Sequence, residues 1–565
     1  MNAGEQTAYD VVVVGSGAGA MMTACRAHDN GLSVVIIEKT DFYGGTSAVS
    51  GGAVWIPNNH HIREDGGNDS PDDALAYLKA ATRGQVPETR INAYIDQAPR
   101  MLRYAEEKTR VRYQANPYYA DYYQDLPGAK VGFRALDVQY FDGRELGGEL
   151  LRMRETSPTM LIFGHTSMTT PEAIVLLSRS PGWRALAAKI LLKYWLDLPW
   201  RLRSARDRRL NMGNALVGGL RRSIMDREIP LWLNTALQTL MVESGRVTGV
   251  CALRAGREVR IAARKAVVLA AGGFERNQQM RNQYLPKPSK AEWTATPPCN
   301  TGDAIRAAQS VGAAVELMQH AWWTPTVRVP GEEKQRGLFS ERALPGCIVV
   351  NRLGKRFANE AQDYLDFVLA MYADHGETAA NLPAWMIFDK RFRCKYNVGP
   401  LMSGSVRPDW LQPRGWLGKV YFRAQTLQGL AAQIGVDGAS LSDSVLKFNG
   451  YAASGVDPEF NRGANKYDVF YGDPGNKPNP CLGPLTEPPY YALPLDAGEI
   501  GTKGGLATDE HARVLTIAGD PIPGLYAVGN TSASVTGPSY PGAGATLGPA
   551  MTFGFVAANH IAGVS

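Results

Sequence analysis

A glycine-rich turn between two short apolar segments is the feature that most restricts the fold of this chain. Residues 11–14 are four consecutive valines, which is typical of a strand buried on both faces of a parallel sheet. The sequence GSGAGA at residues 15–20 follows directly and leads into a helical stretch that ends near Gly31. A second apolar segment, residues 33–37, ends at Glu38. This pattern predicts a βαβ unit in a Rossmann-like α/β domain.

The turn has the residue spacing of a dinucleotide-binding site. Gly15 permits a tight turn, and Gly17 lets the backbone approach a pyrophosphate. The N-terminus of the following helix offers free N–H groups and a partial positive charge to phosphate oxygens. Glu38 is placed to accept hydrogen bonds from the ribose hydroxyls of an adenosine. The sequence therefore predicts a bound dinucleotide rather than a purely structural glycine turn.

Two further groups of small residues favour FAD as this dinucleotide. The loops 44–47 and 50–52 follow Glu38 closely, which suits a flavin diphosphate threaded between loops. Near the other end of the chain, a strand ending at Gly529 precedes a helix predicted over 547–561, whose N-terminus would stabilise negative charge on a reduced flavin. Residues 46–52 contain no histidine that could form a covalent flavin bond. Non-covalent FAD is expected.

Composition and spacing exclude several classes of protein. The net charge of +6, from 60 Lys and Arg against 54 Asp and Glu, is too small an excess to indicate a nucleic acid partner. No uninterrupted apolar run reaches about 18 residues, so no transmembrane helix is expected, and no targeting segment is expected before the first strand. The six cysteines form no CxxC pair, HExxH is absent, and His60-His61 is the only adjacent histidine pair. No metal site is expected, and the chain is predicted to be a reduced, cytoplasmic protein.

Motifs across nearly the whole chain resemble the 3-ketosteroid Δ1-dehydrogenases, FAD enzymes of the fumarate reductase/succinate dehydrogenase flavoprotein superfamily. The most specific motif is SYPGAG at residues 539–544, and GKRFANE at 354–360 and GTKGGLATD at 501–509 agree with it. The superfamily often has an Asp where this chain has Asn530. With the resemblance, the loops above give these expected FAD-binding residues: Gly15, Ser16, Gly17, Ala18, Gly19, Glu38, Lys39, Thr40, Gly44, Gly45, Thr46, Ser47, Ser50, Gly51, Gly52, Ala271, Gly272, Gly529, Asn530, Gly544, Ala545 and Leu547.

The resemblance also implies a set of catalytic residues. Tyr540 and the backbone N–H of Gly544 would polarise the C3 carbonyl of a 3-ketosteroid, and Tyr364 would remove the C2 proton. Tyr122 would hydrogen-bond this base. A donated hydrogen bond favours the phenolate form of a tyrosine, whose free phenol has a pKa of about 10. Three neighbouring tyrosines could replace Tyr122 in this role: Tyr118, Tyr119 and Tyr123.

Two alternative functions stay open at this point. A Δ4-(5α) 3-ketosteroid dehydrogenase would act one bond away on the same ring. A membrane-bound sterol carrier would keep FAD only for structure. In the leading interpretation, which is Δ1-dehydrogenation of a 3-ketosteroid, the hydride from C1 goes to flavin N5. The sequence leaves open the electron acceptor, the side-chain preference at C17 of the steroid and the oligomeric state.

Residues 150–222 fall outside the resemblance to the shorter members and resemble the longer, membrane-associated ones. Within this range, the segment 181–209 is predicted to form a helix that lies on the anionic surface of the inner membrane as a peripheral contact. Apolar and aromatic residues recur there at helical spacing, and five arginines follow with only Asp207 opposing them, which is typical of an interfacial helix. An internal helix or a subunit contact is the alternative. The arginines are Arg201, Arg203, Arg206, Arg208 and Arg209.

The predicted organisation is a discontinuous FAD-binding domain and one inserted domain. Residues 1–320 and 498–565 are assigned to the FAD-binding domain, with the membrane segment inside it. Residues 321–497 are assigned to an α+β domain that covers the substrate and carries Tyr364. The aromatic content of this middle part, including Trp322 and Trp323, suits the wall of a steroid site.

Overall fold

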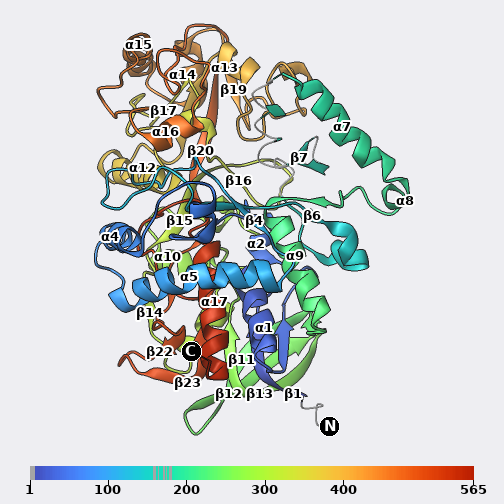
Figure 1. The fold of residues 1–565 in the computed structure, drawn as a ribbon. Helices are drawn as coiled ribbons and strands as arrows, with labels where there is room; N and C mark the ends of the chain where they lie inside the picture. Colours follow the sequence, from blue (N-terminus) through green and yellow to red (C-terminus); the bar gives the residue numbers. More distant parts are fainter. Residues whose placement is uncertain are drawn as a thin grey trace. The chain divides into compact units, whose positions relative to one another are not determined.

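The computed structural model describes residues 7–156, 161–162, 165–168, 172, 175–176 and 181–564, which form two compact units (Figure 1). The first unit consists of Met1–Phe274, Cys299–His320 and Thr502–Ser565. The second unit consists of Glu275–Pro298 and Ala321–Gly501.

These units differ from the sequence-based division at residues 275–298, which belong to the second unit. A buried ion pair explains this difference, because the guanidinium of Arg281 lies 2.9 Å from the carboxylate of Glu499. The backbone of Ala295 also donates to the Glu499 carbonyl. Residues 498–501 join the second unit as well, because they continue its long strand β20 (Tyr490–Thr502).

The first unit is built on the predicted βαβ motif. Strand β1 (Thr7–Val14) pairs in parallel with β2 (Val34–Ile37) and with β13 (Arg257–Leu269), and the apolar residues 11–14 and 34–37 are all buried. The sheet order is β10-β2-β1-β13-β12-β11, with β23 parallel to β13 and β22 antiparallel to β23. The remaining strands of this sheet are β10 (Leu231–Trp232), β11 (Thr235–Glu243), β12 (Arg246–Arg254), β22 (Arg513–Leu515) and β23 (Pro521–Ala527).

Helices α1 (Ala18–Asp29) and α17 (Leu547–Ala562) pack closely beside this sheet (Figure 1). Gly19 in α1 allows the close contact between the two helices, because a Cβ there would lie 2.7 Å from the carbonyl oxygen of Ala550 in α17. Both helices agree with the sequence prediction. The other elements of the unit are α2 (Gly45–Val49), β3 (Val54–Trp55), α3 (His60–Glu64), α4 (Pro71–Thr82), α5 (Glu88–Lys108), β4 (Tyr113–Ala115), β5 (Ala135–Val138), β6 (Phe141–Asp142), η1 (Gly143–Arg152), β7 (Leu161–Ile162), β8 (Thr166–Ser167), α7 (Trp183–Leu196), α8 (Leu198–Arg201), β9 (Arg209–Leu210), α9 (Met212–Asp226), α11 (Asp303–Gln309), β14 (Val315–Glu316), β21 (Gly505–Leu506) and η6 (Gly529–Thr531).

The second unit contains a sheet of order β16-β15-β20-β18-β17, with β19 added to β20. Its β17–β18 and β18–β20 pairs are antiparallel, as expected of an α+β unit. Helices α14 and α15 pack on this sheet through a core that includes Ile348, Leu430 and Phe448. The elements are α10 (Gln278–Tyr284), η3 (Ala291–Trp293), β15 (Ala321–Val327), β16 (Arg336–Gly337), η4 (Glu341–Ala343), β17 (Cys347–Val350), α12 (Tyr364–Thr378), β18 (Ala384–Phe388), α13 (Lys390–Lys395), η5 (Asp409–Leu411), β19 (Phe422–Ala424), α14 (Leu427–Ile434), α15 (Gly438–Ser454), α16 (Lys466–Tyr471) and β20.

Candidate active site

The first predicted turn has the backbone shape that a dinucleotide requires. Gly15 adopts φ +106°, and a Cβ there would lie 2.3 Å from the Ala270 carbonyl oxygen, so only glycine fits. Gly17 is the N-cap of α1. The Ala18 N–H at the start of this helix donates to the Ser47 hydroxyl at 3.1 Å. The first turn and the loop 44–47 therefore meet at the N-terminus of α1, where a phosphate is favoured.

Glu38 lies at the end of β2 within a small network of hydrogen bonds. Its carboxylate accepts from the Ser16 hydroxyl at 2.5 Å and from the backbone N–H of Thr40 at 3.0 Å. The Ser16 hydroxyl in turn accepts from the Gly44 N–H at 3.1 Å. This buried carboxylate beside the turn fits the ribose-binding role expected of it. Lys39, which follows Glu38, forms an ion pair of its own, since its ammonium lies 2.6 Å from the Asp303 carboxylate.

The remaining predicted cofactor residues also lie in the first unit. Asn300 donates to the Thr46 hydroxyl at 2.8 Å, so the segment that begins at Asn300 reaches the loop 44–47. The Thr531 hydroxyl, next to Asn530 in η6, donates to the Gly272 carbonyl at 2.9 Å. Ser50 accepts from the Gly52 N–H at 3.1 Å, whereas Gly51 is exposed. Three residues of the C-terminal turn precede or begin α17: Gly544, Ala545 and Leu547.

Two of the predicted catalytic tyrosines stack on each other. The rings of Tyr122 and Tyr540 are 5.2 Å apart between centroids, and the two residues are only 5% and 4% exposed. The hydroxyls of Tyr119 and Tyr122 are 3.4 Å apart. Tyr118 is 76% exposed and lies outside this group. The structure therefore brings two segments into one buried aromatic cluster, although Tyr123 and Tyr540 are 417 residues apart in the sequence.

Backbone contacts hold the turn that carries Tyr540. The Tyr540 N–H donates to the Tyr123 hydroxyl at 2.9 Å, and the Pro541 carbonyl accepts from both the Tyr122 N–H at 3.0 Å and the Tyr77 hydroxyl at 2.7 Å. Gly544 adopts φ +93°, and a Cβ there would lie 2.5 Å from the backbone of Val54. Tyr123 thus positions the turn.

Several residues that support this turn were not predicted from the sequence. Beneath it, the Trp55 indole donates to Asp121 at 2.8 Å, and Arg134 forms a buried ion pair with the same carboxylate at 2.8 Å. Lys503, which is fully buried, donates to the Thr536 hydroxyl at 3.0 Å and to the Ser539 carbonyl. The only signal for Lys503 was its place as the single charged residue between glycines in the GTKGG motif.

Tyr364 lies in the second unit, as the first residue of α12. It is 5% exposed, and its ring meets that of Phe339 edge to face at 5.3 Å. Four residues before it, Glu360 is buried between Arg356 at 2.7 Å and Arg462 at 3.1 Å. Burial raises the pKa of Glu360, but these guanidinium groups outweigh it and lower the pKa to about 2. Glu360 therefore remains ionised and anchors the segment that leads to Tyr364.

The segment 181–209 forms α7 and α8 within the first unit. Ile190 and Tyr194 face inward and are 2% and 7% exposed. Large apolar side chains on the outside are 59–90% exposed: Leu192, Trp195, Leu196, Leu198 and Leu202. The expected helix is therefore present, with an exposed apolar surface at its C-terminal end. Among the described residues, no helix has the length and hydropathy that crossing a bilayer requires.

The five arginines after this helix do not form the free basic cluster that the sequence suggested. Arg206 donates to the carbonyls of Leu150 and Met153 at 2.8 and 2.5 Å. Ion pairs join Arg208 to Asp197 and Arg209 to Glu172. Arg201 lies over the Tyr194 ring, 4.1 Å from its centroid. Only Arg203 of the five is exposed. Counting charges in the sequence missed these partners, because two of them lie 37 and 56 residues away.

Comparisons with known proteins agree with the geometry of the first unit. The family model described as FAD binding domain matches residues 10–547. A curated relative, 3-oxosteroid 1-dehydrogenase of Mycobacterium tuberculosis (strain ATCC 25618 / H37Rv), is 41% identical, and the match covers 98% of each chain. The chain belongs to the 3-oxosteroid 1-dehydrogenase family.

Two further comparisons bear on the activity of this family member. The crystal structure of 3-ketosteroid delta1-dehydrogenase from Sterolibacterium denitrificans, in complex with 1,4-androstadiene-3,17-dione, is 56% identical with a TM-score of 0.96, covering 99% of this chain and 100% of that one. The 4-oxocyclohexanecarboxylate 2-dehydrogenase of Sinomonas cyclohexanicum is 39% identical, over 99% of this chain and 93% of its own. The 3-oxosteroid 1-dehydrogenase family member described here is thus an FAD-dependent oxidoreductase with the predicted α/β flavoprotein fold.

Proposed function

We propose that this protein removes hydrogens from C1 and C2 of 3-ketosteroids and serves steroid degradation. The observation that carries the proposal is the buried Tyr122–Tyr540 pair beside Gly544, in a chain 56% identical to a 3-ketosteroid delta1-dehydrogenase. The relatives named 3-oxosteroid 1-dehydrogenase support the same substrate class.

In the proposed chemistry, two residues polarise the C3 carbonyl and a third residue removes a proton from C2. The Tyr540 hydroxyl and the Gly544 N–H donate to the C3 oxygen, where negative charge develops as the C2 proton leaves. Tyr364 takes that proton. Tyr122 supports the base through its hydroxyl, and the 3.4 Å contact between its hydroxyl and that of Tyr119 makes Tyr119 a second member of this arrangement.

FAD supplies a hydride acceptor when it is bound. The residues of the first unit fit this group, because Gly15 at φ +106° makes a turn that only glycine allows, and the N-terminus of α1 and Glu38 provide donors and an acceptor. We propose that the pyrophosphate is held by Gly15, Ser16 and Gly17, and that Glu38 binds the adenosine ribose. The binding is non-covalent, and the electron acceptor is a separate molecule.

A second candidate substrate class follows from the relative in Sinomonas cyclohexanicum, whose name gives a smaller cyclic ketone. The same residues could desaturate either ring, because the reaction needs only a ketone with one hydrogen on the α carbon and one on the neighbouring β carbon. Anaerobic mixing with androst-4-ene-3,17-dione, a saturated 3-ketosteroid and 4-oxocyclohexanecarboxylate decides between them by bleaching of the flavin absorbance. Product mass and absorbance distinguish a Δ1 from a Δ4 product. If none of the ketones bleaches the flavin, the protein would be a sterol-binding carrier.

Acid precipitation of the purified yellow protein is expected to release its FAD into the supernatant. The reason is that the segment from Thr46 to Gly52 carries no histidine for a covalent bond. The supernatant is measured by flavin absorbance and fluorescence. Flavin that remains in the pellet after washing would contradict non-covalent binding.

We also propose that α7 and α8 attach the protein to the cytoplasmic side of the inner membrane as a peripheral contact. Exposed leucines and Trp195 on these helices support it, because burying each side chain in the acyl boundary stabilises the bound state by about 1.5–3 kcal/mol. Arg203 and Lys193 are exposed nearby and complement anionic lipid at about 1 kcal/mol each. A sterol dissolves in bilayers, so this contact would shorten its path to the enzyme.

Replacing Trp195 and Leu202 by serine is expected to lower binding to anionic vesicles by at least about tenfold, because two large apolar side chains no longer enter the acyl boundary. Sedimentation with vesicles measures this, and turnover of detergent-solubilised steroid should persist. The matched control replaces Trp410 and Ile517, which are 80% and 87% exposed elsewhere, by serine. A wild-type protein that does not sediment with anionic vesicles at low salt would refute the membrane contact and leave a subunit contact.

A further inference from the structure

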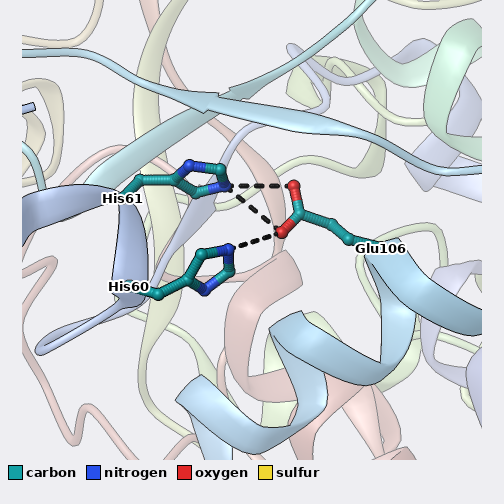
Figure 2. A group of neighbouring side chains, drawn as sticks. All are labelled: His60, His61 and Glu106. Carbon is teal, nitrogen blue, oxygen red and sulfur yellow. Dashed lines mark hydrogen bonds and ion pairs between the residues drawn. The ribbon is translucent and has the colours of Figure 1, made fainter. Parts of the chain in front are cut away.

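Two histidines and one glutamate meet at a point that the proposed reaction does not use. His60 and His61 open the short helix α3, and Glu106 lies near the end of α5 (Figure 2). The Nε2 atom of His60 is 2.9 Å from Oε2 of Glu106. The Nε2 atom of His61 is 3.0 Å from Oε1 and 3.2 Å from Oε2 of the same carboxylate. Both imidazole rings thus aim one nitrogen at one carboxylate.

Hydrogen bonds from two neutral histidines do not satisfy all the polar atoms of this cluster. If both Nε2 atoms carry the hydrogen and donate to Glu106, both Nδ1 atoms are bare acceptors. The Nδ1 atom of His61 then faces the carboxylate of Glu64 at 3.3 Å, which places an acceptor against an acceptor. The Nδ1 atom of His60 is buried and finds no hydrogen-bond partner within the described part of the chain. A positive charge at the centre removes the first conflict.

A transition-metal ion supplies such a charge with little movement of the side chains. Zn²⁺ binds imidazole nitrogen and carboxylate oxygen at about 2.0–2.2 Å, so tetrahedral ligand atoms lie about 3.4 Å apart. The present separations of 2.9–3.2 Å between the nitrogens and the carboxylate oxygens are close to this spacing. All the ligand atoms lie within 4.8 Å of one another.

The surroundings of the cluster also match a metal site. With Nε2 of His61 on the metal, its Nδ1–H donates to Glu64, which is the carboxylate partner that ligating histidines usually have. The Tyr113 N–H donates to Oε1 of Glu106 at 3.0 Å and orients that carboxylate. A cavity of about 360 Å³ borders His60 and leaves space for water as a fourth ligand. Arg63 and Arg103 line the same cavity, and their charge favours hydroxide or another anion there.

We propose that His60, His61 and Glu106 bind one divalent transition-metal ion of the Zn²⁺ class. Nitrogen ligands favour such an ion over Mg²⁺ or Ca²⁺, which prefer oxygen. The bound ion ties α3 to α5 within the first unit. Motif spacing in the sequence does not reveal this group, because Glu106 lies 45 residues from His61. The competing occupant is a proton on His61, which also satisfies Glu64 and Glu106.

The test uses the full-length FAD-loaded enzyme after dialysis against a chelator. Zn²⁺ is titrated in competition with a chromophoric chelator, and Co²⁺ in its place is followed by visible absorption. One ion per chain is expected, with a raised melting temperature. Glu64→Gln should weaken the affinity by about tenfold, the scale of losing a carboxylate partner of a ligand, and His61→Gln should weaken it further.

The matched control is His511→Gln, since His511 is a half-exposed histidine that also neighbours a glutamate. It should bind one ion with unchanged affinity. Flavin absorbance verifies that each variant is folded, and Glu64→Gln keeps the test valid if His61→Gln does not fold, because Glu64 is 63% exposed. Equal affinity in wild type, Glu64→Gln and His511→Gln, or no bound ion in the wild type, would overturn the proposal and leave the proton on His61. Neither outcome affects the proposed dehydrogenation.

Discussion

Replacing Tyr540 by phenylalanine is expected to lower kcat for androst-4-ene-3,17-dione by about 10²–10³-fold, which corresponds to the loss of one oxyanion-hole donor. The hydroxyl is proposed to donate to the C3 oxygen, whose negative charge grows only as the C2 proton leaves. Such a hydrogen bond is stronger in the transition state than in the ground state, so its removal should appear in kcat more than in KM. Steady-state kinetics with a dye acceptor measures both constants.

Folding and FAD content should survive the Tyr540→Phe change. The phenylalanine ring keeps the stacking on Tyr122 at 5.2 Å, and the turn is held by the backbone N–H of residue 540, which donates to Tyr123. The Tyr540 hydroxyl accepts a long hydrogen bond of 3.5 Å from the Thr546 hydroxyl, which can rotate to another acceptor in the variant. Flavin absorbance and melting temperature should therefore stay near the wild-type values.

Tyr118→Phe is the matched control for this experiment. Tyr118 belongs to the same tyrosine-rich segment but is 76% exposed, so removing its hydroxyl should leave kcat unchanged. A Tyr540→Phe enzyme with turnover near that of Tyr118→Phe would rule out Tyr540 as the oxyanion donor. A loss of FAD in Tyr540→Phe would instead show that this residue acts through the fold.

The parts of the cofactor site that could be predicted are those whose backbone permits few alternatives. A strand of four valines followed by Gly15 and Gly17 leaves little choice of fold, because φ +106° and a 2.3 Å approach to Ala270 exclude other residues at position 15. The loop 44–47 follows within the same unit, and its Ser47 meets the start of α1. Local spacing therefore carries most of this information.

Features that depend on distant partners could not be read in the same way. Four adjacent tyrosine candidates look alike in sequence, and only the packing against the turn at 540–544 separates exposed Tyr118 from buried Tyr122. The arginines after α8 look free in the sequence because Glu172 and the carbonyls near Leu150 are far away along the chain. The sequence places residues 275–298 in the wrong unit, because nothing local reveals that Arg281 pairs with Glu499.

Replacing Tyr364 by phenylalanine is expected to slow proton removal by about 10²–10⁴-fold, the usual contribution of a general base. The residue begins α12, where the partial positive charge of the helix N-terminus favours an anionic neighbour such as a phenolate. Because only the proton step is affected, a steroid deuterated at C2 should show a larger kinetic isotope effect in the variant, and one deuterated at C1 a smaller effect. Wild type and variant are compared with both labelled substrates.

Exchange of the C2 hydrogen with deuterated solvent separates this role from a structural one. In enzyme whose flavin is reduced beforehand, hydride transfer from C1 is blocked, so mass increase of the steroid reports proton removal alone. Wild type and Tyr540→Phe should differ in rate, and Tyr364→Phe should show no exchange above the solvent background. Tyr372→Phe is the control, since it removes one hydroxyl from the same helix α12, where Tyr372 donates to the Pro288 carbonyl at 3.1 Å. Continued exchange in Tyr364→Phe would move the base to another tyrosine, with Tyr122 and Tyr123 the next to be changed, because these two lie against Tyr540.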